Sequence, residues 1–185
     1  MKHTVKYIFL ILTLFISQGY ADFIEDDLSI PMFGESREGW SGGIGLGGHS
    51  TSFDAAYDNQ ISVATSLKIG YNFTEQFAVQ YVRNVSWYSL NDTLFISGIT
   101  GLEARYYFTP EQETLYMGIA GGVGDFANLE DEGSETGNAW MATIGYEFSP
   151  HWQAEASWMT TSIDDSYDRT LDTSSVQLLI NYSWY

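Results

Sequence analysis

Apolar and polar residues alternate along much of this chain, which is the pattern of a β-strand with one apolar and one polar face. In residues 61–73 the odd positions are apolar apart from Thr65, whereas the even positions carry Ser, Ala, Lys, Gly and Asn. Successive side chains of a strand point to opposite faces, while helical spacing would mix the two sets. The pattern therefore predicts a strand over residues 61–73.

The same alternation recurs along the chain, and together the segments predict eight strands. Each has large apolar or aromatic residues on one face and small or polar residues on the other. The predicted strands comprise residues 40–48, 61–73, 77–88, 94–108, 115–123, 140–148, 152–160 and 176–184.

The connections between these segments indicate what kind of sheet they form. Three short turns resemble one another, with an aromatic pair followed by Thr or Ser: residues 71–76, 107–111 and 146–151. The other connections are longer and mostly acidic: residues 50–60, 89–93, 125–138 and 161–173.

Short turns at one end, longer loops at the other and aromatic residues at the strand ends are typical of outer-membrane barrels. In lipid every backbone N–H and C=O must be paired within the protein, so a spanning sheet must close on itself. Eight strands give a lumen that side chains can fill. The predicted fold class is therefore all-β, an eight-stranded antiparallel up-and-down transmembrane β-barrel.

The N-terminal residues predict a secretory leader. Lys2, His3 and Lys6 precede an apolar run over residues 7–16, and small residues stand at Gly19 and Ala21. The apolar run is too short to span a bilayer, so residues 1–21 are interpreted as a signal peptide. Residues 22–38, with six acids, are expected to be a periplasmic segment, either flexible or docked at the barrel mouth through residues 30–33. Residues 39–185 are the predicted barrel.

Charge and composition exclude several classes of protein. The chain has 7 basic and 24 acidic residues, net −17, and loss of the leader would leave 7 − 2 = 5 basic residues and a net charge of 5 − 24 = −19. Such a chain should repel nucleic acid, and its 16% aromatic content argues against disorder. The absence of cysteine excludes disulfides, thiolate metal sites and a lipidated N-terminal cysteine.

The leader, the eight strands, the repeated aromatic turn and the aromatic C-terminus together resemble the small outer-membrane barrel proteins of the OmpA/OmpX type, over about residues 39–185. The resemblance implies an integral protein of the Gram-negative outer membrane, monomeric and without a cofactor. Its implied partners are outer-membrane lipids, lipopolysaccharide and the barrel-assembly machinery during biogenesis. One feature departs from the pattern: such barrels usually end on an outward-facing aromatic, whereas Tyr185 falls on the inward phase.

Strict alternation points several charged side chains into the lumen, which predicts an interior charge network. Strand two of an eight-stranded barrel faces strand six, so Lys68 and Glu147 are candidate partners. Glu147 and Glu155 flank one short turn and should repel each other. The predicted network comprises Lys68, Glu103, Arg105, Glu147 and Glu155.

Two bases cannot neutralise the three acids of this network. One carboxylate is therefore expected to be held by neutral donors such as Gln80, Tyr116 or Gln177, or to stay protonated. Long side chains in so narrow a lumen should also block it, which disfavours an ion path.

Arg83 would face lipid by the alternation of its strand. A charge there costs roughly 2–4 kcal/mol at the midplane and little near the interface. We therefore expect Arg83 either to lie near the outer interface or to be turned inward by a bulge.

Three other patterns in the sequence resemble functional sites. The glycine-rich run 42–48 lies within a strand and lacks the following Lys-Ser/Thr and helix of a phosphate loop. His49 and Ser50, with Asp54 nearby, could be compared with lipid A-modifying barrels, but adjacent strand residues point to opposite faces and cannot easily pair. The acidic loop residues could hold Ca²⁺ or be bridged to lipopolysaccharide by divalent ions, but a solvated loop is the preferred interpretation: Glu130, Asp131, Glu132, Asp164, Asp165 and Asp168. No catalytic or metal site is predicted.

Three functions remain open. The leading hypothesis is a non-enzymatic outer-membrane barrel that supports envelope integrity or presents surface loops for contact or adhesion. The second is a narrow, porin-like channel or small-solute binder. The third is a lipid A-modifying enzyme.

Overall fold

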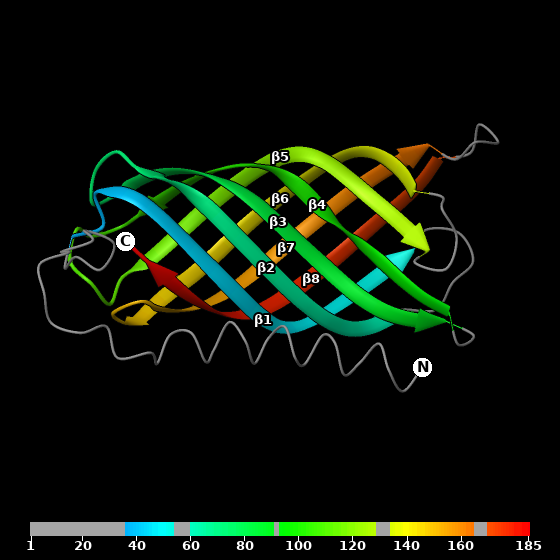
Figure 1. Ribbon diagram of the computed structural model, residues 1–185, viewed down its shortest axis with the longest axis horizontal. Coiled ribbons are helices and arrows are strands. Elements are labelled where there is room, and N and C mark those ends of the chain that lie inside the picture. The colour runs from blue at the N-terminus through cyan, green and yellow to red at the C-terminus, as the bar shows by residue number, and fades with distance from the viewer. Residues whose placement is uncertain (1–35, 54–59, 91–92, 129–133, 165–169) are drawn as a thin grey trace, which may run out of the picture. The chain divides into compact units, whose positions relative to one another are not determined.

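The computed structural model describes residues 36–53, 60–90, 93–128, 134–164 and 170–185, and its strands form one closed antiparallel barrel (Figure 1). Each strand pairs with the next along the chain, and the last pairs with the first, so the sheet has no free edge. The predicted eight-stranded barrel is confirmed. The strands are β1 Gly39–Phe53, β2 Gln60–Asn72, β3 Phe77–Leu90, β4 Thr93–Tyr107, β5 Leu115–Asn128, β6 Ser134–Ser149, β7 Trp152–Asp164 and β8 Thr170–Trp184.

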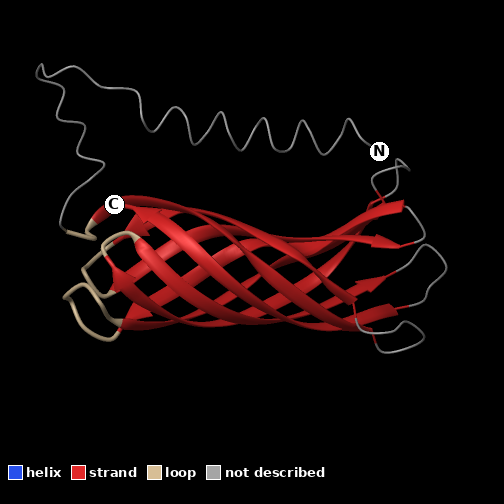
Figure 2. Ribbon diagram, turned by 90° about the horizontal axis from the view of Figure 1, so that it is seen from below, coloured by secondary structure: helices blue, strands red, loops and turns tan. Residues whose placement is uncertain are grey.

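The two ends of the barrel differ. The turns at residues 73–76, 108–114 and 150–151 lie at one end, where β1 also starts and β8 ends (Figure 2). Because short turns are periplasmic in barrels of this kind, we name this the turn end and the opposite one the loop end. In the described part of the chain, no helix is long and apolar enough to cross a membrane.

The strands run further toward the loop end than the sequence pattern predicts. β1 continues to Phe53 instead of residue 48, and β8 begins at Thr170 instead of residue 176. Pairs such as Ser50 with Ile61 continue the backbone ladder where the alternation has ended. A ladder needs only backbone groups, so parts of the predicted loops 50–60, 89–93, 125–138 and 161–173 are strand.

Polarity is inverted relative to a water-soluble barrel. Large apolar side chains cover the outside: Ile61 is 85% exposed, Trp40 72% and Leu102 63%. Charged and amide side chains such as Glu103 and Asn84 are fully buried inside. Exposed apolar surface of this extent is stable only when hydrocarbon covers it. The barrel is therefore built to cross a membrane.

Aromatic rings form a girdle around the turn end. Trp40 packs edge-on against Tyr71 with ring centroids 5.7 Å apart, and Trp152 packs against Tyr182 at 5.2 Å. Rings with an apolar body and a polar tip favour the membrane interface. The girdle marks where the periplasmic surface of the bilayer meets the barrel.

The lumen is filled along its length. Ion-paired and amide side chains occupy the half nearer the turn end, and an apolar layer follows toward the loop end, where buried polar residues such as His49 and Thr161 also lie. Ile99 lies four residues nearer the loop end than Glu103 on β4, and Met159 lies four residues nearer the loop end than Glu155 on β7. The apolar layer comprises Val82, Ile99, Ala120, Ala139, Met141 and Met159.

Inward-facing glycines leave the room that the long polar side chains occupy. A Cβ at Gly145 would lie 2.2 Å from Cζ of Tyr116, and one at Gly118 would lie 2.0 Å from a carboxylate oxygen of Glu103. Neither contact is sterically possible, so the polar layer depends on glycine at these positions.

We predict that Gly145→Ala destabilises the barrel by about 1–3 kcal/mol, because the added methyl group displaces the Tyr116 ring. Gly48→Ala is the matched control, since a Cβ at Gly48 meets nothing within 4 Å. Urea unfolding in lipid vesicles measures both. Equal unfolding midpoints for the two variants would show that the lumen is not tightly packed.

Candidate functional site

Four charged side chains meet in the polar layer of the lumen, and we name them the interior ion cluster: Lys68, Glu103, Arg105 and Glu155. The Lys68 ammonium binds the Glu155 carboxylate. Arg105 Nη2 lies 3.0 Å from Glu155 Oε2 and 3.2 Å from Glu103 Oε2. All four side chains are at most 5% exposed. Two cations therefore neutralise two carboxylates away from solvent.

Neutral groups complete the interior ion cluster. Gln80 donates to Glu103 over 2.7 Å, and Tyr116 donates its hydroxyl to Glu155 over 3.0 Å. The Tyr116 ring also lies 4.3 Å from the Arg105 guanidinium carbon, a cation–π contact. Gln80 and Tyr116 thus donate to carboxylates of the network, whereas the Gln177 amide nitrogen is buried without a protein partner. The expectation of one carboxylate held by neutral donors in place of a cation is wrong, because Glu103 and Glu155 both also bind Arg105.

The predicted pairing of Lys68 with Glu147 is wrong. Strands tilt relative to the barrel axis, so the residues at one level depend on the stagger between strands as well as on strand order. Glu155 on β7 meets Lys68, whereas Glu147 lies near the turn end of β6, two residues before Ser149. Glu147 and Glu155 each have a cation of their own, so repulsion between them does not organise the site.

The cation that binds Glu147 is Arg37, which the sequence analysis missed. Arg37 Nη2 lies 3.1 Å from one carboxylate oxygen of Glu147, and Nε lies 3.3 Å from the other. Arg37 is 1% exposed although it precedes the first strand. Its guanidinium also donates to three backbone carbonyl groups of the turns, those of Glu75, Pro110 and Glu111.

Arg37 therefore closes the turn end of the lumen. Its guanidinium carbon lies 4.6 Å from the centre of the Tyr107 ring, and its backbone N–H donates to the Glu75 carboxylate over 3.0 Å. The described part of the acidic N-terminal segment is thus docked at the mouth, through Arg37. A lone base among six acids just before the first strand is the signal that could have indicated this role.

The six buried charges of the described residues balance. The carboxylates are Glu103, Glu147 and Glu155, and the cations are Arg37, Lys68 and Arg105. Gln153 joins the two groups, because its side-chain oxygen accepts from Arg105 at 3.2 Å and its nitrogen donates to Glu147 at 3.4 Å. The lumen therefore carries a continuous neutral network from its middle to the turn end.

The C-terminal residue belongs to the same network. Tyr185 is buried on the inward phase, as the sequence predicts, and donates its hydroxyl to Glu147 over 3.2 Å. Its ring packs 4.9 Å from that of His151. Burial, and then the negative charge of Glu147, raises the pKa of Tyr185 to about 12.

Arg83 remains on the outer wall, and the alternative of a bulge is wrong because the register of β3 with β4 is unbroken there. Arg83 pairs with Thr100 on β4, which in turn pairs with Val123 on β5. The Arg83 guanidinium does not stay at this level but binds Asp125, two residues nearer the loop end on β5. Its Nη1 and Nη2 donate to the two carboxylate oxygens over 2.5 and 2.6 Å. Arg83 therefore leans toward the outer interface, where a charge costs less.

His49 and Ser50 point in opposite directions. His49 is buried in the lumen at 3% exposure and contacts Thr51, whereas Ser50 is exposed on the outside. This geometry provides no base for an activated serine. Asp54, the acidic clusters 130–132 and 165–168, the leader and residues 22–35 lie outside the described residues.

Solved structures of other proteins share the architecture. The attachment invasion locus protein Ail of Yersinia pestis superposes with a TM-score of 0.55 at 20% identity, over 79% of this chain and 99% of Ail. Neisserial surface protein A (NspA) does so with a TM-score of 0.52 at 16% identity, over 78% of this chain and 97% of NspA. No protein-family model and no curated protein matches the sequence.

The fold is that of a small outer-membrane β-barrel. The inverted polarity makes this outer-membrane barrel an integral membrane protein, since its apolar wall requires hydrocarbon. Structural similarity at sequence identities of 20% and below shows the fold alone. The function has to be inferred from the residues of this chain.

We predict that Arg105→Leu destabilises this outer-membrane barrel by about 3–5 kcal/mol, because Glu103 and Glu155 would keep buried charge without that partner. The double variant Arg105→Leu/Glu103→Leu should recover part of the loss, since it also removes one stranded carboxylate. The midpoint of urea unfolding measures both. An Arg105→Leu barrel as stable as the wild type would refute the role of the cluster.

A second prediction concerns alkaline pH. A pKa raised from 10 to about 12 in the folded state means that Tyr185 contributes stability in full below pH 10. That contribution is lost as the pH rises through about 12. Tyr185→Phe should therefore flatten this part of the stability profile. Parallel profiles for wild type and Tyr185→Phe would contradict the assignment.

Proposed function

We propose that this protein is a non-enzymatic outer-membrane barrel with a closed lumen, which supports the envelope and presents its extracellular loops for contact with other surfaces. The observation that carries the proposal is the filling of the lumen. The apolar layer blocks the lumen on the loop side of the interior ion cluster, and Arg37 closes the turn end. A solute would have to break buried ion pairs to pass.

The charge of the chain supports a choice of partner. Each Lys or Arg that the structure describes is ion-paired with a carboxylate: Arg37, Lys68, Arg83 and Arg105. The sequence of the loops is acidic, as in residues 130–132, and the whole chain carries −17. We therefore propose that the loops contact cationic surfaces, by charge complementarity.

The proposed cationic partner is opposite in charge to a ligand of one structural neighbour. Ail has been solved in complex with the heparin analogue sucrose octasulfate, a polyanion. A polyanion needs accessible cations, and each described Lys and Arg here already has a carboxylate partner. We do not extend heparin binding to this chain.

We predict that the purified, folded barrel gives no steady conductance in planar bilayers. Gel mobility with and without boiling establishes that the sample is folded. Steady single-channel currents from the folded fraction would contradict the closed lumen and favour the narrow-channel alternative.

The contact role has its own test. Bacteria that display the wild-type barrel should adhere to polylysine-coated beads and not to heparin-coated beads. Glu130→Gln/Asp131→Asn in a loop should weaken adhesion to polylysine. Glu111→Gln/Glu113→Gln removes the same charge from a turn at the opposite end and is the matched control. Equal loss in both variants, or adhesion to heparin, would contradict the proposal.

A further inference from the structure

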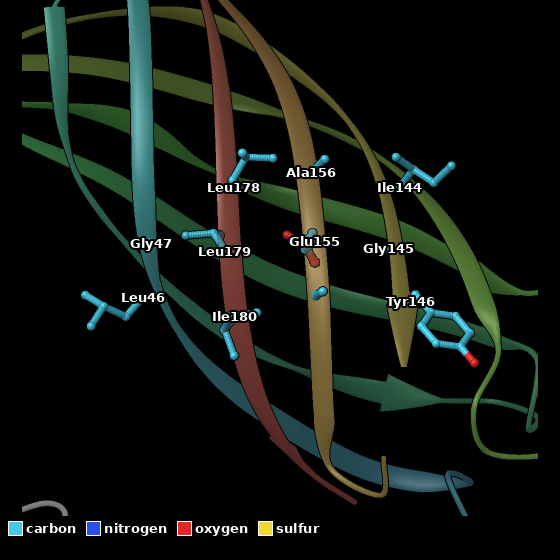
Figure 3. Close-up of a pocket in the computed structure, with 11 residues that line it drawn as sticks. Leu46, Gly47, Ile144, Gly145, Tyr146, Glu155, Ala156, Leu178, Leu179 and Ile180 are labelled. Carbon is cyan, nitrogen blue, oxygen red and sulfur yellow. The ribbon is translucent and has the colours of Figure 1, made fainter. Parts of the chain in front are cut away.

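A shallow apolar trough crosses the outer wall over β6, β7, β8 and β1, with β7 at its floor (Figure 3). Its floor is made of Ala154 and Ala156, which are successive outward-facing residues of β7. Larger side chains of the neighbouring strands form its two sides. Ala156 pairs with Ile144 and Leu178, and Ala154 pairs with Tyr146 and Ile180. We name these six residues the β7 trough.

The β7 trough is open toward the membrane. The whole depression, which also reaches Leu46 and Gly47 of β1, has a volume of about 420 Å³. The side walls stand free of the rest of the chain, with Ile144 56% and Leu178 62% exposed. It is continuous with the apolar wall of the barrel, so hydrocarbon is what covers it.

Another outward-facing alanine shows that the β7 trough is a special feature. Ala104 on β4 pairs with Val79 and Ile119, but it lies between Leu102 and Tyr106 on its own strand. These large neighbours limit the depression to one residue. On β7 two consecutive outward positions are alanine, so the depression extends over two positions of the strand.

Two tryptophans bound the β7 trough along the strand. Trp152 begins β7 directly after a periplasmic turn, and its ring packs 5.2 Å from that of Tyr182. Trp158 is held at the other end by donating its indole N–H to Ser174 over 2.9 Å. Trp158 is six residues, or about 20 Å of strand, from Trp152, which at a tilt of about 40° is about 15 Å of membrane depth. The alanine floor between them therefore lies within the periplasmic half of a hydrocarbon core of about 30 Å.

We propose that the β7 trough holds one acyl chain of a phospholipid of the periplasmic leaflet, as a lipid retained more firmly than its neighbours. The position of the floor next to Trp152 selects the periplasmic leaflet. A chain lying between two fixed ridges gains dispersion contacts on three sides, whereas a chain on a convex wall gains them on one. This inference rests on the membrane location of the barrel and does not depend on the contact role of the loops.

Native mass spectrometry of the folded barrel tests the proposal. Wild-type protein released from vesicles of phosphatidylethanolamine with 16-carbon chains should retain one phospholipid. Ala156→Leu, which fills the floor, should lose it, and the matched control Ala104→Leu should keep it. Gel mobility without boiling establishes that each variant is folded.

A second measurement needs no variant. Wild-type protein should retain the 16-carbon lipid and not phosphatidylethanolamine with 6-carbon chains, because the chain is what the β7 trough binds. Equal retention of both lipids, no retained lipid, retention of lipopolysaccharide in its place, or the mass of a dimer would each overturn the proposal. Protein that fails to enter vesicles at all would instead refute the membrane location.

Discussion

A sheet that crosses a bilayer meets no water along its walls, so every backbone N–H and C=O must be bonded to a neighbouring strand. Closure of β1 onto β8 meets that requirement, and the inverted polarity follows from it. The outward positions must be apolar, and the polar side chains are left with the lumen. The lumen therefore has to hold charged and amide side chains in a narrow space away from water.

The solution is charge balance combined with steric fit. Three cations and three carboxylates are buried within the described residues. Their charges cancel, so the lumen does not bear the free-energy cost of a buried net charge. Glycine at positions such as 118 and 145 provides the space that Glu103 and Tyr116 need. Because the ion cluster and the glycines fit each other, neither can change alone. A network of this kind favours one rigid arrangement over a water-filled pore.

The sequence reveals the wall of this barrel better than its interior contacts. A period of two assigns each residue to a face, which is why Lys68, Glu103, Arg105, Glu147, Glu155 and Tyr185 all lie inside as predicted. Partners across the lumen depend on tilt and stagger, which alternation does not encode, so Lys68 was paired with the wrong glutamate. Alternation does not predict the role of Arg37, because this residue precedes the first strand and belongs to no periodic segment. Strand ends near the loops were missed because backbone pairing continues there without an apolar face.

The proposed function rests on a lumen that buried, charge-balanced side chains fill, which makes the outer surfaces the candidates for contact. The most direct test is the exchange of side-chain protons with water, followed by nuclear magnetic resonance on ¹⁵N-labelled protein in lipid nanodiscs. The Lys68 ammonium and the Arg105 guanidinium should give resolved signals that exchange slowly, because both groups are buried and ion-paired. Exchange at the rate of freely hydrated side chains would show that water fills the lumen and would contradict the account.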